Sequence, residues 1–295
     1  MDRFSEIRAF VCVAELGSFV AAAERLELSR AMVTKLVAAL ENRLGVRLMH
    51  RTTRKLSLTE AGETYLAQAG SLLSELDELD ALLSHGASEP VGRLRVSAPV
   101  SFGMRYLGRI IGGFHQRHPQ IEVELSLNDR RVDLVEEGFD LALRVSNLSD
   151  SSLVARKLAQ IEDLLAASPA YLARHGMPRD PAELAGHQCL LYALTAQPNV
   201  WDYQAPDGSQ GRVKVRGGLK ANNGDVLTDA AVHGMGIVLQ PRFLLEEELA
   251  DGRLVPVLPG YHWHCLDLSV VYPVRRHVPG KVRVFVDYLA EFFSA

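Results

Sequence analysis

Two short helical patterns separated by a three-residue turn constrain the N-terminal fold most strongly. Ser18 precedes the first pattern and Ser29 precedes the second, and serine is a preferred residue at a helix N-cap. Between the patterns, residues 26–28 are too short for anything except a tight turn. Apolar residues recur every three to four positions on one face of each segment: Phe19, Ala22, Ala23 and Leu26, then Val33, Leu36, Val37, Leu40 and Leu44. With a further helical pattern at residues 4–16, this arrangement predicts a helix-turn-helix.

The polar side of the second of these helices carries residues suited to DNA. Arg30, Thr34 and Lys35 lie one turn apart near its N-terminal end, where a recognition helix meets base edges and phosphates. Arginine can bind guanine through two hydrogen bonds, and threonine and lysine can contact bases or phosphates. We therefore predict DNA contacts by these three residues and by the capping residues Ser18 and Ser29. The alternative is a solvated polar face on a surface helix.

A basic hairpin follows this helix. Residues 46–50 and 56–58 can pair as two short strands, with Arg51, Arg54 and Lys55 at the tip between them. Basic tips of this kind lie along the phosphate backbone or in the adjoining minor groove. The pattern predicts a wing, and Arg51, Thr52 and Arg54 complete the predicted DNA-binding set.

The distribution of charge supports a DNA-binding N-terminal part. The formal net charge of the whole chain is −4, which by itself argues against nucleic acid. Residues 25–55 nevertheless carry eight basic and two acidic side chains, whereas residues 71–90 carry five acidic side chains and no lysine or arginine. A basic block beside an acidic segment is typical of a DNA-binding module on an acidic body.

A long helix is predicted from Glu60 to about His85, because this stretch contains no proline and has an apolar stripe. The stripe consists of Leu66, Ala69, Leu72, Leu76, Leu79 and Leu83. A helix of ~25 residues is ~38 Å long, too long to bury its stripe against one small domain. Pairing with a second copy of the chain is the economical explanation; packing on the C-terminal part is the alternative. Residues 85–92 have the composition of a hinge.

The run GSFVAAAERLELSRAMVTKLVAALENRLGVRLMHRTTRKLSLTEAG, residues 17–62, resembles the DNA-binding domain of LysR-type transcriptional regulators. The matching positions include Leu26, Ser29, Val33, Thr34, Leu40, Glu41, Leu44, Gly45, Leu48, Arg51, Arg54, Leu58, Thr59, Ala61 and Gly62. Arg30, Ala31 and Lys35 depart from the usual family residues, so the DNA target cannot be transferred from relatives. The resemblance implies a bacterial regulator of transcription with a winged helix-turn-helix, and a linker helix that forms a homodimer. Relatives are commonly homotetramers.

After residue 92 the pattern changes to alternating strands and helices. Strands are predicted at 93–97, 121–127, 139–145, 161–167, 189–192, 213–216, 236–239 and 266–272, and helices at 101–117, 130–138, 169–175, 224–233, 241–249 and 279–293. The pattern favours two α/β lobes like those of periplasmic binding proteins, with the chain crossing between them near 163–168 and 266–273. The predicted parts are therefore a DNA-binding domain at 1–59, a linker at 60–88 and an effector-binding domain at 89–295, α+β overall.

Ligands of open α/β sheets bind beyond the carboxyl ends of the strands, often at a helix N-terminus. Three predicted strand ends and one helix start carry suitable residues: Pro99, Val100, Ser101 and Phe102; Asn128 and Asp129; Arg144; and Asn222 and Asn223. Ser101 and Asn223 can instead cap helices, Asn128 and Asp129 can simply form a turn, and Arg144 can bridge to Asp129 or Glu137. Several stretches, including LKANNGDVL, also resemble the LysR effector domain, and members of that subgroup often sense small organic or aromatic acids.

Other function classes find little support. The chain has no GxxxxGK[ST], HExxH or GxSxG motif, and the pairs His115/His118 and His262/His264 lack an evident third metal ligand. Cys12, Cys189 and Cys265 are far apart, which favours packed thiols over a redox sensor. The N-terminus resembles no signal peptide, and no apolar run approaches a membrane span. We expect a cytoplasmic regulator with no enzymatic activity, cofactor or metal; an enzyme and a solute-binding transport protein on the same two-lobed fold are the rivals.

Overall fold

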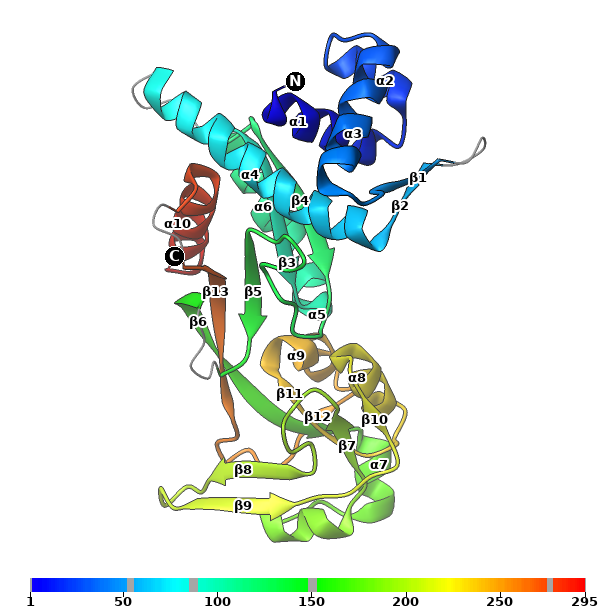
Figure 1. The fold of residues 1–295 in the computed structure, drawn as a ribbon. Coiled ribbons are helices and arrows are strands. Elements are labelled where there is room, and N and C mark those ends of the chain that lie inside the picture. Colours follow the sequence, from blue (N-terminus) through cyan, green and yellow to red (C-terminus); the bar gives the residue numbers. More distant parts are fainter. Residues whose placement is uncertain (1, 52–55, 85–89, 148–152, 275–277, 295) are drawn as a thin grey trace.

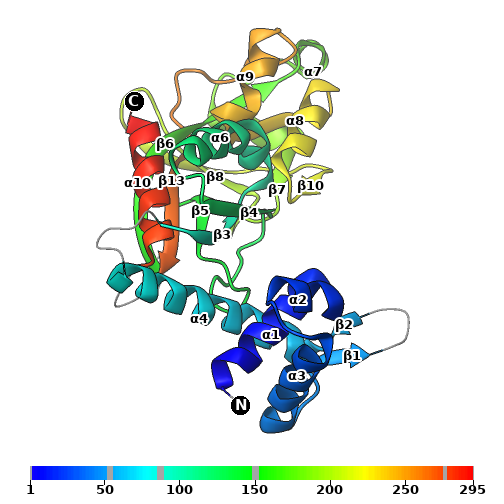
Figure 2. The same cartoon turned by 90° about the horizontal axis from the view of Figure 1, so that it is seen from above.

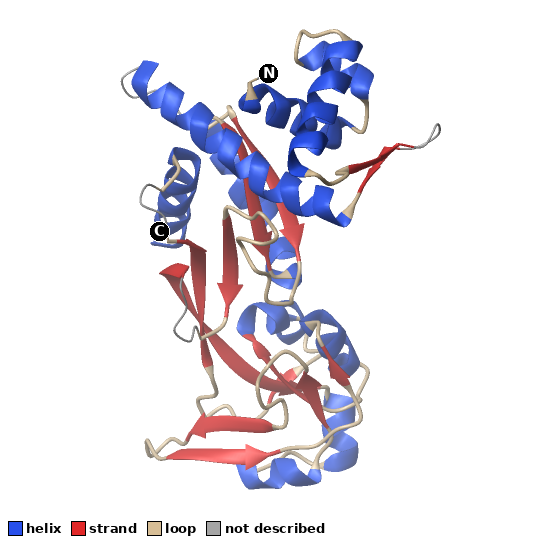
Figure 3. Cartoon of the chain, viewed as in Figure 1, coloured by secondary structure: helices blue, strands red, loops and turns tan. Residues whose placement is uncertain are grey.

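The computed structural model describes residues 2–51, 56–84, 90–147, 153–274 and 278–294. Figure 1 shows a small N-terminal domain, one long helix and a larger body of two lobes in succession along the chain. Figure 3 shows that the N-terminal domain is mainly helical, whereas strands and helices are mixed in the two lobes. The structure therefore has the predicted α+β organisation.

The N-terminal domain is built on three helices: α1 Arg3–Leu16, α2 Phe19–Arg25 and α3 Arg30–Leu44. The hydroxyl of Ser18 accepts a hydrogen bond from the N–H of Ala21, and the hydroxyl of Ser29 accepts one from the N–H of Met32. Both predicted N-caps are thus confirmed. The apolar faces of the three helices meet in one buried cluster around Phe10, which fixes the angle between α2 and α3.

The predicted hairpin is present as β1 Met49–Arg51 and β2 Leu56–Leu58, which pair antiparallel. A buried carboxylate, that of Glu41 in α3, anchors its first strand. Its Oε1 accepts hydrogen bonds from the N–H of Leu48 at 2.9 Å and from the N–H of Met49 at 3.1 Å. The side chain of Glu41 is only 4% exposed, so these bonds tie the start of the hairpin to the recognition helix in a site shielded from water.

The start of the long helix packs against residues 47–48, which precede the first strand of the hairpin. The Thr59 hydroxyl donates to the carbonyl of Arg47 at 2.7 Å, and the Thr59 N–H donates to the carbonyl of Leu48 at 3.0 Å. Gly62 lies directly over Leu48: a Cβ atom added at Gly62 would lie 2.0 Å from the Leu48 carbonyl oxygen. The close approach requires glycine at this position.

We expect Gly62→Ala to destabilise the N-terminal domain by about 1–3 kcal/mol, the usual cost of forcing extra atoms into a packed site. Urea unfolding followed by far-UV circular dichroism would measure the loss. Gly70→Ala is the matched control, since it lies in the same helix and an added Cβ would meet nothing within 4 Å. Alanine there should be neutral or stabilising, by up to about 1 kcal/mol. Equal effects of the two substitutions would contradict the packing argument.

The long helix α4 spans Glu60–Ser84 and has the predicted length of 25 residues. Its first half uses part of the apolar stripe within the chain, because Leu66, Ala69 and Leu73 pack against the N-terminal core. Leu72 points away and is 58% exposed. The helix therefore buries only part of its stripe against the N-terminal domain, and pairing of the remainder with a second copy stays a prediction. The side chains of Leu79 and Leu83 lie outside the described residues.

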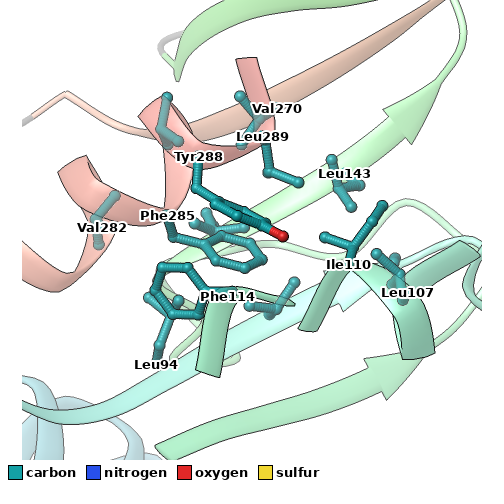
Figure 4. Close-up of a cluster of buried hydrophobic side chains, with 14 of the residues drawn as sticks. Leu94, Leu107, Ile110, Phe114, Leu143, Val270, Val282, Phe285, Tyr288 and Leu289 are labelled. Atoms are coloured by element: carbon teal, nitrogen blue, oxygen red, sulfur yellow. The ribbon is translucent and has the colours of Figure 1, made fainter. Parts of the chain in front are cut away.

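The first lobe, lobe I, consists of β3 Gly92–Ala98, α5 Val100–Phe102, a π-helical turn at Gly103–Leu107, α6 Gly108–Arg117, β4 Ile121–Leu127, β5 Leu141–Val145, part of β6 Leu153–Ala167, β13 Cys265–Pro273 and α10 Gly280–Ser294. Figure 4 shows its core, in which side chains of α6 and α10 meet over the sheet. The ring of Phe114 lies edge-on to Phe285, with centroids 4.8 Å apart, and 5.5 Å from Tyr288. The C-terminal helix thus completes this lobe.

The predicted helix at 130–138 was wrong. The chain makes a turn there, in which the carboxylate of Asp133 accepts hydrogen bonds from the N–H groups of Val135 and Glu136. Gly138, with φ of 69°, ends the turn and returns the chain toward β5. The apolar residues that suggested a helix have another role: Leu134 is buried against the face of the sheet opposite α6.

The second lobe, lobe II, consists of the remainder of β6, α7 Pro169–His175, a 3₁₀ turn at Pro181–Gly186, β7 Cys189–Tyr192, β8 Val200–Gln204, β9 Gln210–Lys214, β10 Lys220–Ala221, α8 Gly224–Val232, β11 Ile237–Pro241, α9 Arg242–Ala250 and β12 Val255–Pro256. The strand expected at 213–216 lies earlier, as β9, and pairs antiparallel with β8, which was not predicted. The structure thus adds a two-stranded hairpin to the predicted lobe.

One sheet joins the two lobes. Its strand order is β10-β7-β11-β6-β13-β5-β3-β4, with β12 also paired to β6. The 15-residue strand β6 pairs with β13 over its first part and with β11 over Asp163–Ala166, so it crosses between the lobes near residue 163. The return crossing lies just before β13, because residues 268–271 are already paired with β5. Figure 2 shows α10 beside β13, and Figure 1 shows α8 and α9 at the end of lobe II that faces α5 of lobe I. Among the described helices, none is long and apolar enough to cross a bilayer.

Candidate DNA-binding surface and interlobe site

The N-terminal half of α3 presents a basic surface. Arg30 and Lys35 are exposed, and no carboxylate among the described residues forms an ion pair with either. Thr34 is half-buried, and its hydroxyl donates to the carbonyl of Arg30 at 2.8 Å. With its proton occupied, the hydroxyl of Thr34 offers DNA a hydrogen-bond acceptor, beside the methyl group that can contact thymine. The structure thus brings the three predicted helix residues together on one face.

Ser18 and Ser29 both act as helix caps, because each hydroxyl oxygen accepts a backbone N–H. Each hydroxyl still has its own proton to donate, which suits a contact with a phosphate oxygen. Figure 1 shows the hairpin extending from the same side of the domain as α3. Arg51 ends β1, but its side chain, like Thr52 and Arg54, lies outside the described residues.

Other basic residues of the N-terminal block have structural partners. Arg43 donates from Nε to the buried carboxylate of Glu6 at 3.1 Å, and this hydrogen bond raises the pKa of Arg43. The Nη1 of Arg47 lies 3.3 Å from Oε2 of Glu41. The charge count alone could not separate these residues from Arg30 and Lys35, because the separation depends on tertiary contacts.

The predicted effector residues of lobe I lie at the carboxyl ends of β3 and β4. Asp129 holds these two ends together, since its Oδ1 accepts a hydrogen bond from the N–H of Val100 at 2.9 Å. Asn128 forms the turn that was its alternative role, because its Oδ1 accepts from the N–H of Arg130 at 2.8 Å. Phe102 is 2% exposed and belongs to the core of the lobe.

Lobe II contributes the N-terminal end of α8. Asn223 caps this helix by accepting the N–H of Val226 at 3.2 Å, as its alternative role foresaw. The same side chain also reaches lobe I, since its Nδ2 donates to Oδ2 of Asp129 at 3.2 Å. Asn222, the other predicted residue, is exposed beside it. The structure therefore brings Asp129 and Asn223 together from opposite lobes.

Two residues that the sequence did not indicate dominate this contact. Asp225, in the first turn of α8, accepts a hydrogen bond at Oδ2 from the Ser101 hydroxyl at 2.5 Å. Its Oδ1 accepts a hydrogen bond from Nη2 of Arg105 at 2.7 Å. More than 100 residues separate Asp225 from both partners, so only tertiary structure could identify the pair. An acidic residue just inside the α8 N-terminus was the sole local signal.

An aromatic contact lies beside these polar bonds. Phe243 of α9 lies edge-on to Phe102, with centroids 6.0 Å apart, and to Tyr106, with centroids 5.9 Å apart. Burial, together with the charge of Glu246, raises the pKa of the Tyr106 phenol. The two lobes therefore touch through polar and apolar groups at once.

Arg144 binds backbone carbonyls in place of the carboxylates of Asp129 or Glu137, the alternative partners expected from the sequence. Its guanidinium donates to the carbonyl oxygens of Arg130, at 3.4 Å, and Val132, at 3.2 Å. Burial is the main cause that lowers its pKa, and Arg131 adds to the shift. Glu137 is paired with Arg130 instead. Arg144 therefore supports the turn at 130–138, where it holds backbone carbonyls.

A separate groove of about 1050 Å³ lies between the end of β5 and the β8–β9 hairpin. It is lined by Asn147, Asp202, Tyr203, Gln204, Gln210, Gly211, Arg212, His262, Trp263, His264 and Cys265. No predicted effector residue lines it. Although His262 and His264 both face this groove, the described residues contain no group of three or more side chains suited to a metal.

Two of the three cysteines are packed thiols, and the third is exposed. Cys12 and Cys189 are buried, and burial raises the pKa of the Cys189 thiol to about 12. Cys265 is exposed, yet burial of its sulfur and the nearby carboxylate of Glu162 raise its pKa as well. Since the thiolate is the reactive form, these surroundings disfavour thiol chemistry.

Comparison with known proteins gives matches over both parts of the chain. Residues 4–63 match the family described as "Bacterial regulatory helix-turn-helix protein, lysR family", and residues 87–294 match the "LysR substrate binding domain". An HTH-type transcriptional regulator of Haemophilus influenzae is 39% identical over 282 residues, which cover 96% of this chain and 98% of that protein. The regulator DmlR of Escherichia coli is 35% identical, with 98% and 94% covered.

Solved structures match over the same extent. CrgA, a LysR-type transcriptional regulator from Neisseria meningitidis, matches with a TM-score of 0.61 and 35% identity, over 98% of each chain. The virulence activator AphB of Vibrio cholerae matches with a TM-score of 0.59 and 33% identity, over 97% of this chain and 98% of that one. The matches thus extend over the N-terminal domain, the long helix and both lobes.

Proposed function

The chain belongs to the LysR family of transcriptional regulators, and from that premise we propose that its effector is a small organic acid bound between the two lobes. As a member of this family it is a DNA-binding regulator, not an enzyme, and it has a small-molecule effector domain and forms oligomers. The specific features proposed below rest on the residues of this chain.

The observation that carries the DNA-binding role is the exposed face of α3, where Arg30, Thr34 and Lys35 lie together on a helix capped by Ser29. In our proposal Arg30 contacts a base edge, while Ser18 and Ser29 contact phosphates. Arg51, Thr52 and Arg54 follow the backbone from the wing. Double-stranded promoter DNA is thus the partner, in the bacterial cytoplasm.

We assign DNA binding to residues 1–59, linkage and dimerisation to 60–88, and effector binding to 89–295. The exposed Leu72 in α4 supports pairing of this helix with a second copy. A symmetric dimer would place two recognition helices in successive major grooves, ~34 Å apart. A tetramer built from two such dimers would extend the contact over further half-sites.

An organic acid fits the lobe I side of the interlobe contact. Ser101 offers a hydroxyl and Arg105 a guanidinium, two groups that bind carboxylates well. Arg105 is held in place by a hydrogen bond from Nη1 to the carbonyl of Ser101 at 3.2 Å. Because its side chain is 35% exposed, a ligand can reach it from solvent. The ligand must bind two arrangements of the lobes unequally to change DNA binding.

Fluorescence anisotropy with DNA upstream of the chain's own gene, across a salt series, tests the proposal. We expect selective binding that weakens steeply with salt, and a shift in affinity when a carboxylic acid from a screened panel is added. Loss of even nonspecific, salt-dependent binding would overturn the DNA-binding assignment. A panel in which only neutral or cationic compounds act would overturn the organic-acid assignment.

Arg30→Ala should relax discrimination at one base position, at a cost of about 1–3 kcal/mol for the preferred sequence and little for others. Arg51→Ala and Arg54→Ala should instead weaken binding to all sequences and lower the salt slope by about one ion per lost contact. Competition binding with single-base operator variants measures both effects. A uniform loss across all variants in Arg30→Ala would show that Arg30 contacts only phosphate.

A further inference from the structure

The contact between the lobes already contains a carboxylate bound by lobe I, and the chain itself supplies it. Asp225 extends from α8 of lobe II, and its two oxygens accept hydrogen bonds from Ser101 and Arg105 of lobe I, at 2.5 Å and 2.7 Å. A hydroxyl on one oxygen and a guanidinium on the other are the contacts by which a protein binds a free carboxylate. Lobe I therefore holds Asp225 as it would hold an acid ligand.

The groups around this contact are held by hydrogen bonds that do not involve Asp225. Arg105 donates to the carbonyl of Ser101, so the guanidinium is fixed beside the hydroxyl within one turn of lobe I. Asp129 accepts the N–H of Val100 and orders the preceding residues. Since these bonds lie within lobe I, removal of Asp225 would leave a shaped carboxylate site.

The contact between Arg105 and Asp225 is also accessible to solvent. Arg105 and Asp225 are 35% and 36% exposed, so solvent and solutes reach the pair. The neighbouring interlobe bond, between Asn223 and Asp129, joins an amide to a carboxylate and does not involve Arg105. Among the described residues, Arg105–Asp225 is the one ion pair between the turn at 103–107 and α8, so displacing Asp225 would break that ion pair while the adjacent bond could persist.

We propose that the Asp225 carboxylate occupies the place of an effector carboxylate, so that Asp225 and an acid effector compete for Ser101 and Arg105. This rests on the organic-acid function proposed above. Because the competing carboxylate is part of the chain, the apparent affinity for every acid is the intrinsic affinity multiplied by the fraction of molecules in which the site is free. A simple monocarboxylate that displaces Asp225 makes the same contacts with Ser101 and Arg105 that Asp225 gives up, so the exchange yields little net binding free energy. An effector must therefore bring a second recognised group, and the internal carboxylate excludes abundant small acids.

Rescue with acetate tests this competition directly. Asp225→Ala removes a group the size of acetate, so acetate should enter the vacated place in the full-length variant. We expect a saturable rise in melting temperature with acetate, over chloride at equal ionic strength, and an acetate affinity at least about tenfold above that of the unchanged protein. Asp229→Ala is the matched control, because Asp229 lies one turn further along α8, is 76% exposed and contacts His233 on its own helix.

A second variant distinguishes loss of the carboxylate from a folding defect. Asp225→Asn keeps the size of the side chain but removes its charge, and it should raise the affinity for acids in the same direction. Adding Arg105→Met to Asp225→Ala should abolish the gain for acetate. A gain that is equal in Asp229→Ala, that survives Arg105→Met, or that chloride matches would overturn the proposal.

The outcome is separable from that of the proposed function. If Asp225→Ala gains an acetate site but no acid changes DNA binding by the unchanged protein, the competition stands and the organic-acid effector fails. If the panel yields an acid effector whose affinity is the same in Asp225→Asn and the unchanged protein, the effector stands and the competition fails.

Discussion

Asp163→Asn should stabilise lobe II more at pH 8 than at pH 5, by roughly 2–3 kcal/mol. Asp163 lies in β6 where the strand passes between the lobes, is 8% exposed, and has one carboxylate oxygen, Oδ1, with no hydrogen-bond partner. Burial, aided by the charge of the adjacent Glu162, raises the pKa of Asp163 from 3.8 to about 7. Each pKa unit corresponds to about 1.4 kcal/mol, and about two units of this window lie between pH 5 and the raised pKa, which gives the expected difference.

The direction follows from proton binding. Between pH 4 and 7 the folded chain holds a proton on Asp163 that the unfolded chain has released, so the free energy of unfolding falls as pH rises through this window. Above pH 7 the carboxylate is charged in both states, and the full burial penalty remains. Asparagine cannot ionise, so the variant lacks this loss. Any effect of the amide itself is the same at both pH values, so the difference between them reports the charge of Asp163 alone.

Tryptophan fluorescence during urea unfolding would measure the effect. The chain has two tryptophans, and Trp201 and Trp263 both lie in the core of lobe II. Asp202→Asn is a suitable control, since Asp202 forms an exposed pair with Arg212 and should change stability by less than about 1 kcal/mol at either pH. A gain for Asp163→Asn that is the same at pH 5 and pH 8 would contradict a charged Asp163 as its cause.

Glu41→Ala should destabilise the N-terminal domain by about 2–5 kcal/mol and abolish specific DNA binding. The substitution leaves the N–H groups of Leu48 and Met49 without their acceptor in a buried site. Each buried donor left unpaired costs about 1–3 kcal/mol. Since these donors lie at the start of the hairpin, the wing loses its fixed position relative to α3 even where the helices remain folded.

Urea unfolding and anisotropy with specific and random DNA would separate the two consequences. Glu63→Ala is the matched control, because Glu63 is an exposed glutamate in the first turn of α4. It should change stability by less than about 0.5 kcal/mol. Unchanged stability and DNA binding in Glu41→Ala would show that water can replace the carboxylate.

The predictions from sequence were most accurate where the causes are local. Ser18 and Ser29 cap their helices because a serine before an apolar pattern needs only nearby N–H groups. At 130–138, by contrast, the residues favour a helix, but Asp133 and Gly138 close a turn and Arg144 binds carbonyls of the same segment. Tertiary contacts there outweigh propensity.

The β8–β9 hairpin could have been predicted. Pro206, Asp207 and Gly208 are turn residues between two short segments rich in β-forming side chains, and Asp207 does accept the N–H of Ser209 in the turn. The contact of Asp225 with Ser101 and Arg105 could not, since it joins residues that share no local pattern. Local signals therefore identified Ser101 and Asn223 at the interlobe contact, and tertiary structure identified the charged pair beside them.

The path of the chain through the sheet has a consequence for synthesis on the ribosome. Lobe II is built from one continuous stretch, from about residue 163 to 264, whereas lobe I needs β13 and α10, the last elements to emerge. The nascent chain can fold its N-terminal domain and then lobe II while the sheet of lobe I is still incomplete, with the edge of β5 that pairs with β13 still exposed. A premature stop codon anywhere after residue 264 would thus release a chain with two finished units joined through an unfinished one, a ready substrate for chaperones and proteases.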